Sequence, residues 1–217
     1  MKMCKAYKRF IIKKGDPLDQ KQLMSLLDEM PPMGILSKGS VKFKKTFLSH
    51  LLKNPLGTIV IAVEQKSKKI IGYVIAIRHP LCFWKNMALS SASFTLIILS
   101  AKKIANKLLS ILKKMPGSLK NFKKISVEKR HEFKWSPSDP KIARIIFIGI
   151  LSDFRGLGIG ESLYLFLSET LREEKCIKIE AHIDEGNMPS LKLHRKNGWN
   201  IEEMCQENYK ATLNLKK

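Results

Sequence analysis

The sequence predicts an α/β fold in which helices flank a β-sheet. Two β-rich runs, 58–64 and 70–77, are separated only by the polar segment 65–69, which is typical of a β-hairpin. Residues 145–151 are almost all apolar and β-branched, as expected for a central strand covered on both faces. Helix-like and strand-like patterns then alternate to the end of the chain, which favours a sheet with helices packed on it.

The N-terminal residues predict a first strand at 7–13 and two amphipathic helices. A helix is expected over 16–30, because Pro17 stands in its first turn and apolar residues recur at helical spacing. A second helix is expected over 41–53, where lysines lie opposite an apolar face.

Residues 80–140 separate the two parts of the predicted sheet and predict a helical, basic insertion. A weakly polar helix is expected over 87–100 and a basic amphipathic helix over 102–115, which Pro-Gly ends. We therefore predict a single domain of residues 1–217 that carries this insertion.

The C-terminal third predicts a helix that starts at Ile159 and has an apolar face at spacings of three and four residues. It is followed by a strand at 177–183, a short helix at 188–196 and a final hairpin within 201–215.

Positive charge is concentrated in the first part of the chain. Residues 1–140 hold 28 Lys and Arg against 8 Asp and Glu, whereas residues 141–217 hold 12 against 11. Such a region would attract an anionic substrate, partner or lipid surface. A lysine-rich genome composition would produce the same excess without a partner, so both explanations stay open. No recognised nucleic-acid motif accompanies the charge, and we expect no nucleic-acid partner.

The four cysteines lie far apart and form no C-x-x-C pair, so the sequence indicates neither a zinc site nor a disulfide framework. The basic N-terminus does not resemble a secretory signal. The longest nearly uncharged stretch, 86–101, is shorter than the roughly 20 residues of an ordinary membrane-spanning helix. We expect a cytoplasmic protein without a metal, peripheral association with a membrane being the alternative.

The heptapeptide FRGLGIG, Phe154 to Gly160, places three glycines at alternate positions between a strand and a helix. The dinucleotide fingerprint would require a glycine where Glu161 stands, and a Walker loop would require Lys followed by Ser or Thr after Gly160. Both nucleotide motifs are therefore excluded. A helix that starts after a glycine turn can bind an anion with its first amides, but a tight turn without a ligand fits equally well.

Two segments of the C-terminal third resemble the GCN5-related N-acetyltransferase (GNAT) family. RGLGIG, Arg155 to Gly160, is similar to the family's R/Q-x-x-G-x-G/A loop, and NMPSLKLHRKNGW, Asn187 to Trp199, is similar to its N-x-x-A-x-x-x-Y-x-K-x-G-F segment. The resemblance implies a mixed, mostly antiparallel sheet with a splayed parallel strand pair, and an acetyl-coenzyme A binding core at 141–205. It also implies a set of cofactor-binding residues: Ile148 and Ile150 at the pantetheine arm, Arg155, Gly156, Leu157, Gly158, Ile159 and Gly160 at the pyrophosphate, and Asn187 and Ser190 near the thiol.

Two histidines are the candidate catalytic residues. His182 precedes Asn187 by five residues, where ribosomal-protein acetyltransferases of this family carry a glutamate base, and histidine titrates near neutrality. His194 replaces the tyrosine to which the family's thiolate protonation is attributed. For each histidine, a merely solvated or cofactor-contacting side chain is the alternative.

The resemblance implies an N-acetyltransferase that moves an acetyl group from acetyl-coenzyme A to a primary amine by direct attack in a ternary complex. We expect a small-molecule acceptor such as an amino sugar or a nucleotide-linked amino sugar. The alternatives are a peptide or protein amine, and a non-catalytic acetyl-coenzyme A binding protein that docks on an anionic membrane. Homodimerisation through the insertion stays open.

Overall fold

The computed structural model describes residues 4–6, 9–30, 40–90, 139, 141–184, 186–204 and 208–215. The chain divides into two compact units, Met1–Phe83 with Asp139–Lys217, and Trp84–Ser138. The first unit contains all the strands named below. The helix predicted over 102–115 and most of the one predicted over 87–100 lie outside the described residues, so the division into a core and an insertion stays a prediction.

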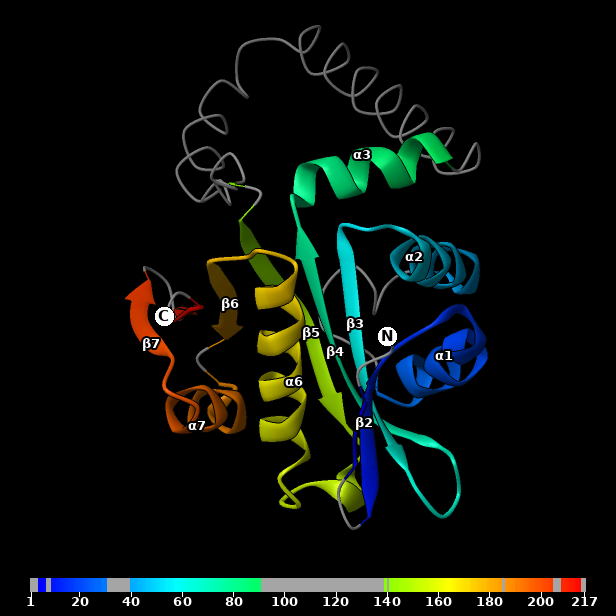
Figure 1. Cartoon of the computed structure of the whole chain (residues 1–217), viewed down its shortest axis with the longest axis horizontal. Coiled ribbons are helices and arrows are strands. Elements are labelled where there is room, and N and C mark those ends of the chain that lie inside the picture. The colour runs from blue at the N-terminus through cyan, green and yellow to red at the C-terminus, as the bar shows by residue number, and fades with distance from the viewer. Residues whose placement is uncertain are drawn as a thin grey trace, which may run out of the picture. The chain divides into compact units, whose positions relative to one another are not determined.

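The described strands form one mixed sheet in the order β1-β2-β3-β4-β5-β6-β8-β7 (Figure 1). Neighbouring strands are antiparallel except β5 and β6, which are parallel. This confirms the predicted fold class. The strands are β1 (Cys4–Ala6), β2 (Phe10–Lys14), β3 (Gly57–Glu64), β4 (Ile70–Arg78), β5 (Ile142–Ile150), β6 (Lys178–Asp184), β7 (Asn200–Met204) and β8 (Asn208–Asn214).

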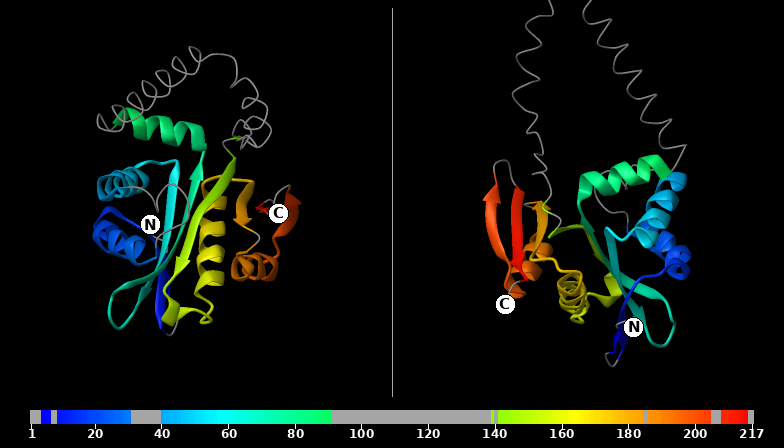
Figure 2. Two further views of the ribbon diagram at one scale, coloured as in Figure 1. Left: turned by 180° about the vertical axis from the view of Figure 1, so that it is seen from behind. Right: turned by 45° about the horizontal axis from the view of Figure 1, so that its top comes forward.

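Helices cover both faces of this sheet (Figure 2). Gly57 pairs with Ile77, five positions from Gly72, so the two glycines face opposite sides of the sheet. A Cβ added at Gly57 would meet Leu51 of α2 (Val41–Lys53), whereas one added at Gly72 would meet Ile159 of α6 (Ile159–Glu173). Helices α2 and α6 therefore pack on opposite faces. No helix among the described residues is long and apolar enough to cross a membrane. In the first unit the helices are η1 (Pro17–Asp19), α1 (Gln20–Glu29), α2 (Val41–Lys53), η3 (Ser152–Phe154), α6 (Ile159–Glu173) and α7 (Met188–Lys196).

Local signals set the helix bounds well. Both α2 and α7 have the predicted limits, and each begins at a side-chain cap, since Ser40 Oγ accepts from Phe43 N at 3.2 Å and Asn187 Oδ1 accepts from Ser190 N at 3.2 Å. Helix α3 (Pro80–Ser90) begins seven residues earlier than the helix predicted from residue 87. The prediction did not include residues 80–86, although proline is well suited to a first helical turn.

Strands β5 and β6 run side by side for only part of their length. Their ladder extends from Ile142 opposite Lys178 to Ile145 opposite Ala181, while β5 continues to Ile150. Residues 145–150 are half-buried, so the prediction that 145–151 is covered on both faces is wrong for this stretch. The reason is the divergence of β6, which leaves one edge of β5 without a paired strand in the described part of the chain.

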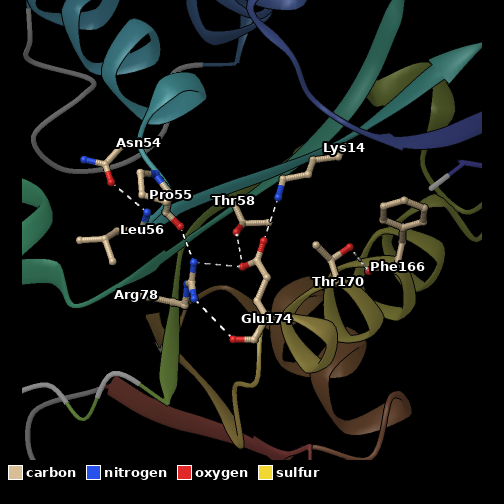
Figure 3. Close-up of polar contacts among 9 residues, drawn as sticks. All are labelled: Lys14, Asn54, Pro55, Leu56, Thr58, Arg78, Phe166, Thr170 and Glu174. Carbon is tan, nitrogen blue, oxygen red and sulfur yellow. Dashed lines mark hydrogen bonds and ion pairs between the residues drawn. The ribbon is translucent and has the colours of Figure 1, made fainter. Parts of the chain in front are cut away.

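A polar cluster ties the C-terminal end of α6 to strands β2, β3 and β4 (Figure 3). Glu174, which caps α6, accepts from Lys14 Nζ at 2.8 Å and Thr58 Oγ1 at 3.2 Å, and its carboxylate lies 3.5 Å from Arg78. These three partners come from β2, β3 and β4. Arg78 also donates to the Pro55 carbonyl. One carboxylate thus holds three adjacent strands at one helix end.

Replacing Glu174 by leucine should lower the free energy of unfolding by about 2 kcal/mol, because Arg78 and Thr58 would lose a half-buried partner. Urea denaturation measures this change. The matched control is Lys14→Met, which removes only the exposed ion pair and should cost no more than about 0.5 kcal/mol. Equal losses in both variants would contradict the central role of the carboxylate.

Candidate functional site

The glycine turn links the end of β5 to the start of α6. Gly156 and Gly158 both have φ of +78°, a backbone conformation that L side chains rarely adopt, so the turn requires glycine at these two positions. A Cβ built on either residue would meet no described atom within 4 Å. The space above the turn is therefore open to a ligand.

The third glycine of the motif has a different role. Gly160 lies inside α6 and is buried, and a Cβ there would come within 2.9 Å of Leu193 and 3.3 Å of Ile150. Its missing side chain lets α6 approach both α7 and β5. Ile159 is likewise buried, so of the predicted pyrophosphate residues these two contribute main-chain groups only.

The N-terminus of α6 faces the turn. The first main-chain bond of the helix runs from Ser162 N to Gly158 O at 3.0 Å, and no described side chain caps the helix. The amides of residues 159–161 lack intrahelical acceptors and lie at the positive end of the helix dipole. Arg155, within the turn, is exposed and donates from Nε to Ile150 O at 3.2 Å, which holds its guanidinium at the end of β5. The arrangement is suited to an anion such as a pyrophosphate.

The open edge of β5 leads directly to this turn. Leu151 N donates to Ile71 O at 3.0 Å, and Tyr73 pairs with Gly149. In an antiparallel ladder, residues that hydrogen-bond to the partner strand alternate with residues that do not. Gly149 and Leu151 face β4, so Ile148 and Ile150 direct their main-chain groups away from β4, toward the diverging β6. This edge can bind an extended chain that carries amide groups.

Asn187 and Ser190 lie at the start of α7. Asn187 is exposed and its Oδ1 caps the helix, while Ser190 is half-buried and its carbonyl accepts from His194 Nδ1 at 2.8 Å. Both residues therefore orient α7. Their predicted contact with a thiol stays a prediction.

His194 is in the protein interior, with 1% of its surface exposed. Because Nδ1 donates to the Ser190 carbonyl, Nε2 accepts the hydroxyl proton of Tyr164 at 2.9 Å. The ring also lies against Trp199, with ring centroids 4.7 Å apart. Burial lowers the pKa of His194, although the Ser190 carbonyl opposes this shift. Both nitrogens are thus engaged, which favours a packing role over that of a proton donor.

His182 is exposed on β6, on the sheet face opposite the core residues Ile179, Ala181 and Ile183. His194 packs with Tyr164 on the core side, so the two candidate catalytic histidines lie on opposite faces of β6. Partial burial of the ring and the positive charges of nearby Arg144 and Lys210 lower the pKa of His182. Its imidazole is consequently neutral at neutral pH and can accept a proton.

Beside His182 lies an ion network that sequence reasoning missed. Glu180 is 5% exposed and contacts Arg144 at 3.2 Å, Lys178 at 3.1 Å and Lys210 at 3.3 Å. Burial raises the pKa of Glu180, but the hydrogen bonds and charges of Lys178 and Lys210 outweigh burial and keep that pKa below its ordinary value. Only the strand registers bring these residues together, and no motif signals them.

A hollow of about 570 Å³ opens beside the glycine turn. It was also missed, because Arg9 lies near the N-terminus and far from the glycine motif in sequence. Its walls are Arg9, Phe10, Leu157, Gly158, Glu161, Ser162 and Leu165.

Comparisons with known proteins agree with the fold. Residues 101–199 match the family model described as the acetyltransferase (GNAT) family. No curated protein matches the chain in sequence.

Solved structures match nearly the whole chain at low identity. A GNAT-family acetyltransferase from Staphylococcus aureus Mu50 has a TM-score of 0.56 and 12% identity, with 95% of this chain and 99% of that chain covered. Arabidopsis thaliana NAA60 in complex with acetyl-CoA has a TM-score of 0.55 and 11% identity, with 94% and 98% covered. The ribosomal-protein-alanine N-acetyltransferase of Escherichia coli has a TM-score of 0.54 and 11% identity, with 96% and 95% covered. The family model thus matches a GNAT acetyltransferase domain at residues 101–199, and the chain shares its fold with solved GNAT-family acetyltransferases.

Proposed function

We propose that the protein transfers an acetyl group from acetyl-coenzyme A to a primary amine. One observation carries this proposal. Strand β6 diverges from β5 after Ile145, and the edge of β5 that this divergence opens continues directly into the glycine turn. An extended amide-containing arm with a pyrophosphate at one end has the chemistry that fits both.

The residues of the site have separate tasks in this proposal. The amides of Gly156 to Gly160 and the guanidinium of Arg155 bind the pyrophosphate, where the two left-handed glycines leave room for it. The main-chain groups of Ile148 and Ile150 bind the pantetheine amides as a further strand would. Acetyl-coenzyme A supplies a thioester whose carbonyl carbon is open to attack by an amine.

His182 is the proposed general base. An alkylamine has a pKa of about 10 and is mostly protonated at neutral pH, so one proton must be removed before its nitrogen can attack. As the new C–N bond forms and the C–S bond breaks, the thiolate leaves and takes up a proton. The buried, doubly hydrogen-bonded ring of His194 is poorly suited to deliver that proton, and we propose that it positions α7 instead.

We propose a small-molecule acceptor such as an amino sugar or a nucleotide-linked amino sugar, because the positive charge of residues 1–140 suits phosphate groups. A peptide amine is the second candidate. It is supported by His182, which occupies the position of the glutamate base in similar ribosomal-protein acetyltransferases, and by the N-acetyltransferases among the similar folds.

Coenzyme A release from acetyl-coenzyme A, measured with a panel of amino sugars, nucleotide-linked amino sugars and N-terminal peptides, tests the proposal. We expect turnover with one amine class, accompanied by a mass increase of one acetyl group on the acceptor. Tight binding of acetyl-coenzyme A without turnover on any amine would instead support a non-catalytic protein. Binding to anionic vesicles in the same experiment would identify the membrane-docking alternative.

A further inference from the structure

The surroundings of His182 differ from those of an ordinary surface histidine. On β6 the residues that share its face are Lys178, Glu180 and Asp184. Across the β6–β8 ladder, Lys210 is its direct partner in register. Arg144 on β5 is in register with Glu180, and Glu202 on β7 is in register with Lys210. Four described strands therefore contribute charged groups around one imidazole.

Glu180 fixes the positions of the cations in this cluster. Its carboxylate is buried and binds Lys210 Nζ and Lys178 Nζ on the same oxygen, while Arg144 Nε binds the other oxygen. Lys210 and Lys178 are also equally accessible to solvent, since each side chain is 31% exposed. Three cations contact the one carboxylate of Glu180, so Glu180 alone does not neutralise all of them; Asp184 and Glu202 are the other carboxylates around His182.

The two lysines differ in their relation to His182. Lys210 lies directly opposite the histidine, where side chains on one sheet face are about 5 Å apart at Cβ. The backbone of Lys178 lies four residues back along the same strand, which is about 13 Å, although its Nζ contacts the same oxygen of Glu180 as Lys210 Nζ. A positive charge disfavours protonation of a neighbouring imidazole, and this effect weakens with distance and with screening by salt.

We infer that Lys210, held opposite His182 by the buried carboxylate of Glu180, is a positioning residue that keeps the His182 imidazole in its neutral, proton-accepting form. The inference deepens the proposed function, on which its catalytic consequence rests. Burial of the ring is the largest cause that lowers the pKa of His182, and the charge of Arg144 is the next. Glu180 opposes them, and Lys210 adds a smaller effect in the lowering direction.

The test compares Lys210→Met with Lys178→Met in the full-length protein. The imidazole resonances of His182 are assigned by their loss in His182→Gln and are followed by NMR from pH 5 to pH 8.5. We expect Lys210→Met to move the His182 midpoint to higher pH and Lys178→Met to move it less. Equal shifts in both variants, or none in either, would overturn the inference.

Two further variants separate charge from folding. Lys210→Arg keeps the charge and should keep the wild-type midpoint. Lys210→Gln removes the charge but keeps a donor for Glu180, and should behave like Lys210→Met; a Lys210→Gln midpoint equal to that of wild type would again overturn the inference. Acetyl-coenzyme A binding by each variant reports an intact fold.

Activity provides an independent readout. Once an amine acceptor is identified, kcat/KM of Lys210→Met at pH 6 relative to pH 8.5 should fall about twofold below the wild-type ratio, because less His182 is neutral at pH 6. If the NMR midpoint moves while this ratio does not, the electrostatic inference stands and the proposed role of His182 as the base fails. If the midpoint does not move, the inference fails whatever the activity.

Discussion

Replacing Gly158 by glutamate is expected to weaken acetyl-coenzyme A binding at least about 100-fold. Gly158 has a left-handed backbone, and its absent side chain leaves open the space in front of the α6 amides. The carboxylate of a glutamate would lie where the negatively charged pyrophosphate is proposed to bind, and like charges in contact cost several kcal/mol. Isothermal titration calorimetry with acetyl-coenzyme A measures the loss.

The chain offers a matched control for this change. Gly198 also has a left-handed backbone, with φ of +74°, and a Cβ there would meet no described atom within 4 Å. It follows α7, away from the glycine turn. Gly198→Glu should therefore carry a similar conformational cost while acetyl-coenzyme A affinity stays within about twofold of wild type. Undiminished affinity in Gly158→Glu would refute the assignment of the turn.

His182→Gln is expected to reduce kcat/KM about 100-fold or more, which is the contribution typical of a positioned general base. The affinity for acetyl-coenzyme A should not change, because His182 lies on β6 and not at the glycine turn. Initial rates with the identified amine, combined with direct titration of acetyl-coenzyme A, separate the two quantities.

The pH dependence gives a second test of the same residue. Since the surroundings lower the pKa of His182, the base is neutral above its ordinary value of about 6.5, and activity should fall only as the pH drops below that value. The acidic limb should disappear in His182→Gln. Asp184→Asn is the matched control, because Asp184 is the next exposed residue on the same face of β6. A rate loss in Asp184→Asn as large as that in His182→Gln would argue against a specific base.

Sequence reasoning succeeded where the signal is local. The limits of α7 follow from the capping side chain of Asn187, the proline in its first turn and the Asn-Gly pair that follows. The FRGLGIG motif likewise predicted a strand, a turn and a helix in the right order, and its first two glycines have the left-handed geometry that such a turn requires.

Reasoning from the sequence failed where partners come from distant strands. The apolar composition of residues 145–151 predicted burial on both faces, but composition does not report that β6 leaves β5 after Ile145. A polar residue in a sequence also does not reveal its neighbours. The burial of His194 against Tyr164, and the convergence of Lys14, Thr58 and Arg78 on Glu174, depend on packing across the sheet.

The sequence by itself determined most of the segments that become helices and strands, where the glycine turn lies and which histidines are candidates for catalysis. These properties depend on residues within a few positions of one another, through backbone preference, capping and hydrophobic periodicity. Only the tertiary structure decided that His182 lies in a charged cluster and His194 in the core. Those environments are set by strand register, which places residues such as Lys210 and His182 opposite each other although they are 28 positions apart in the chain.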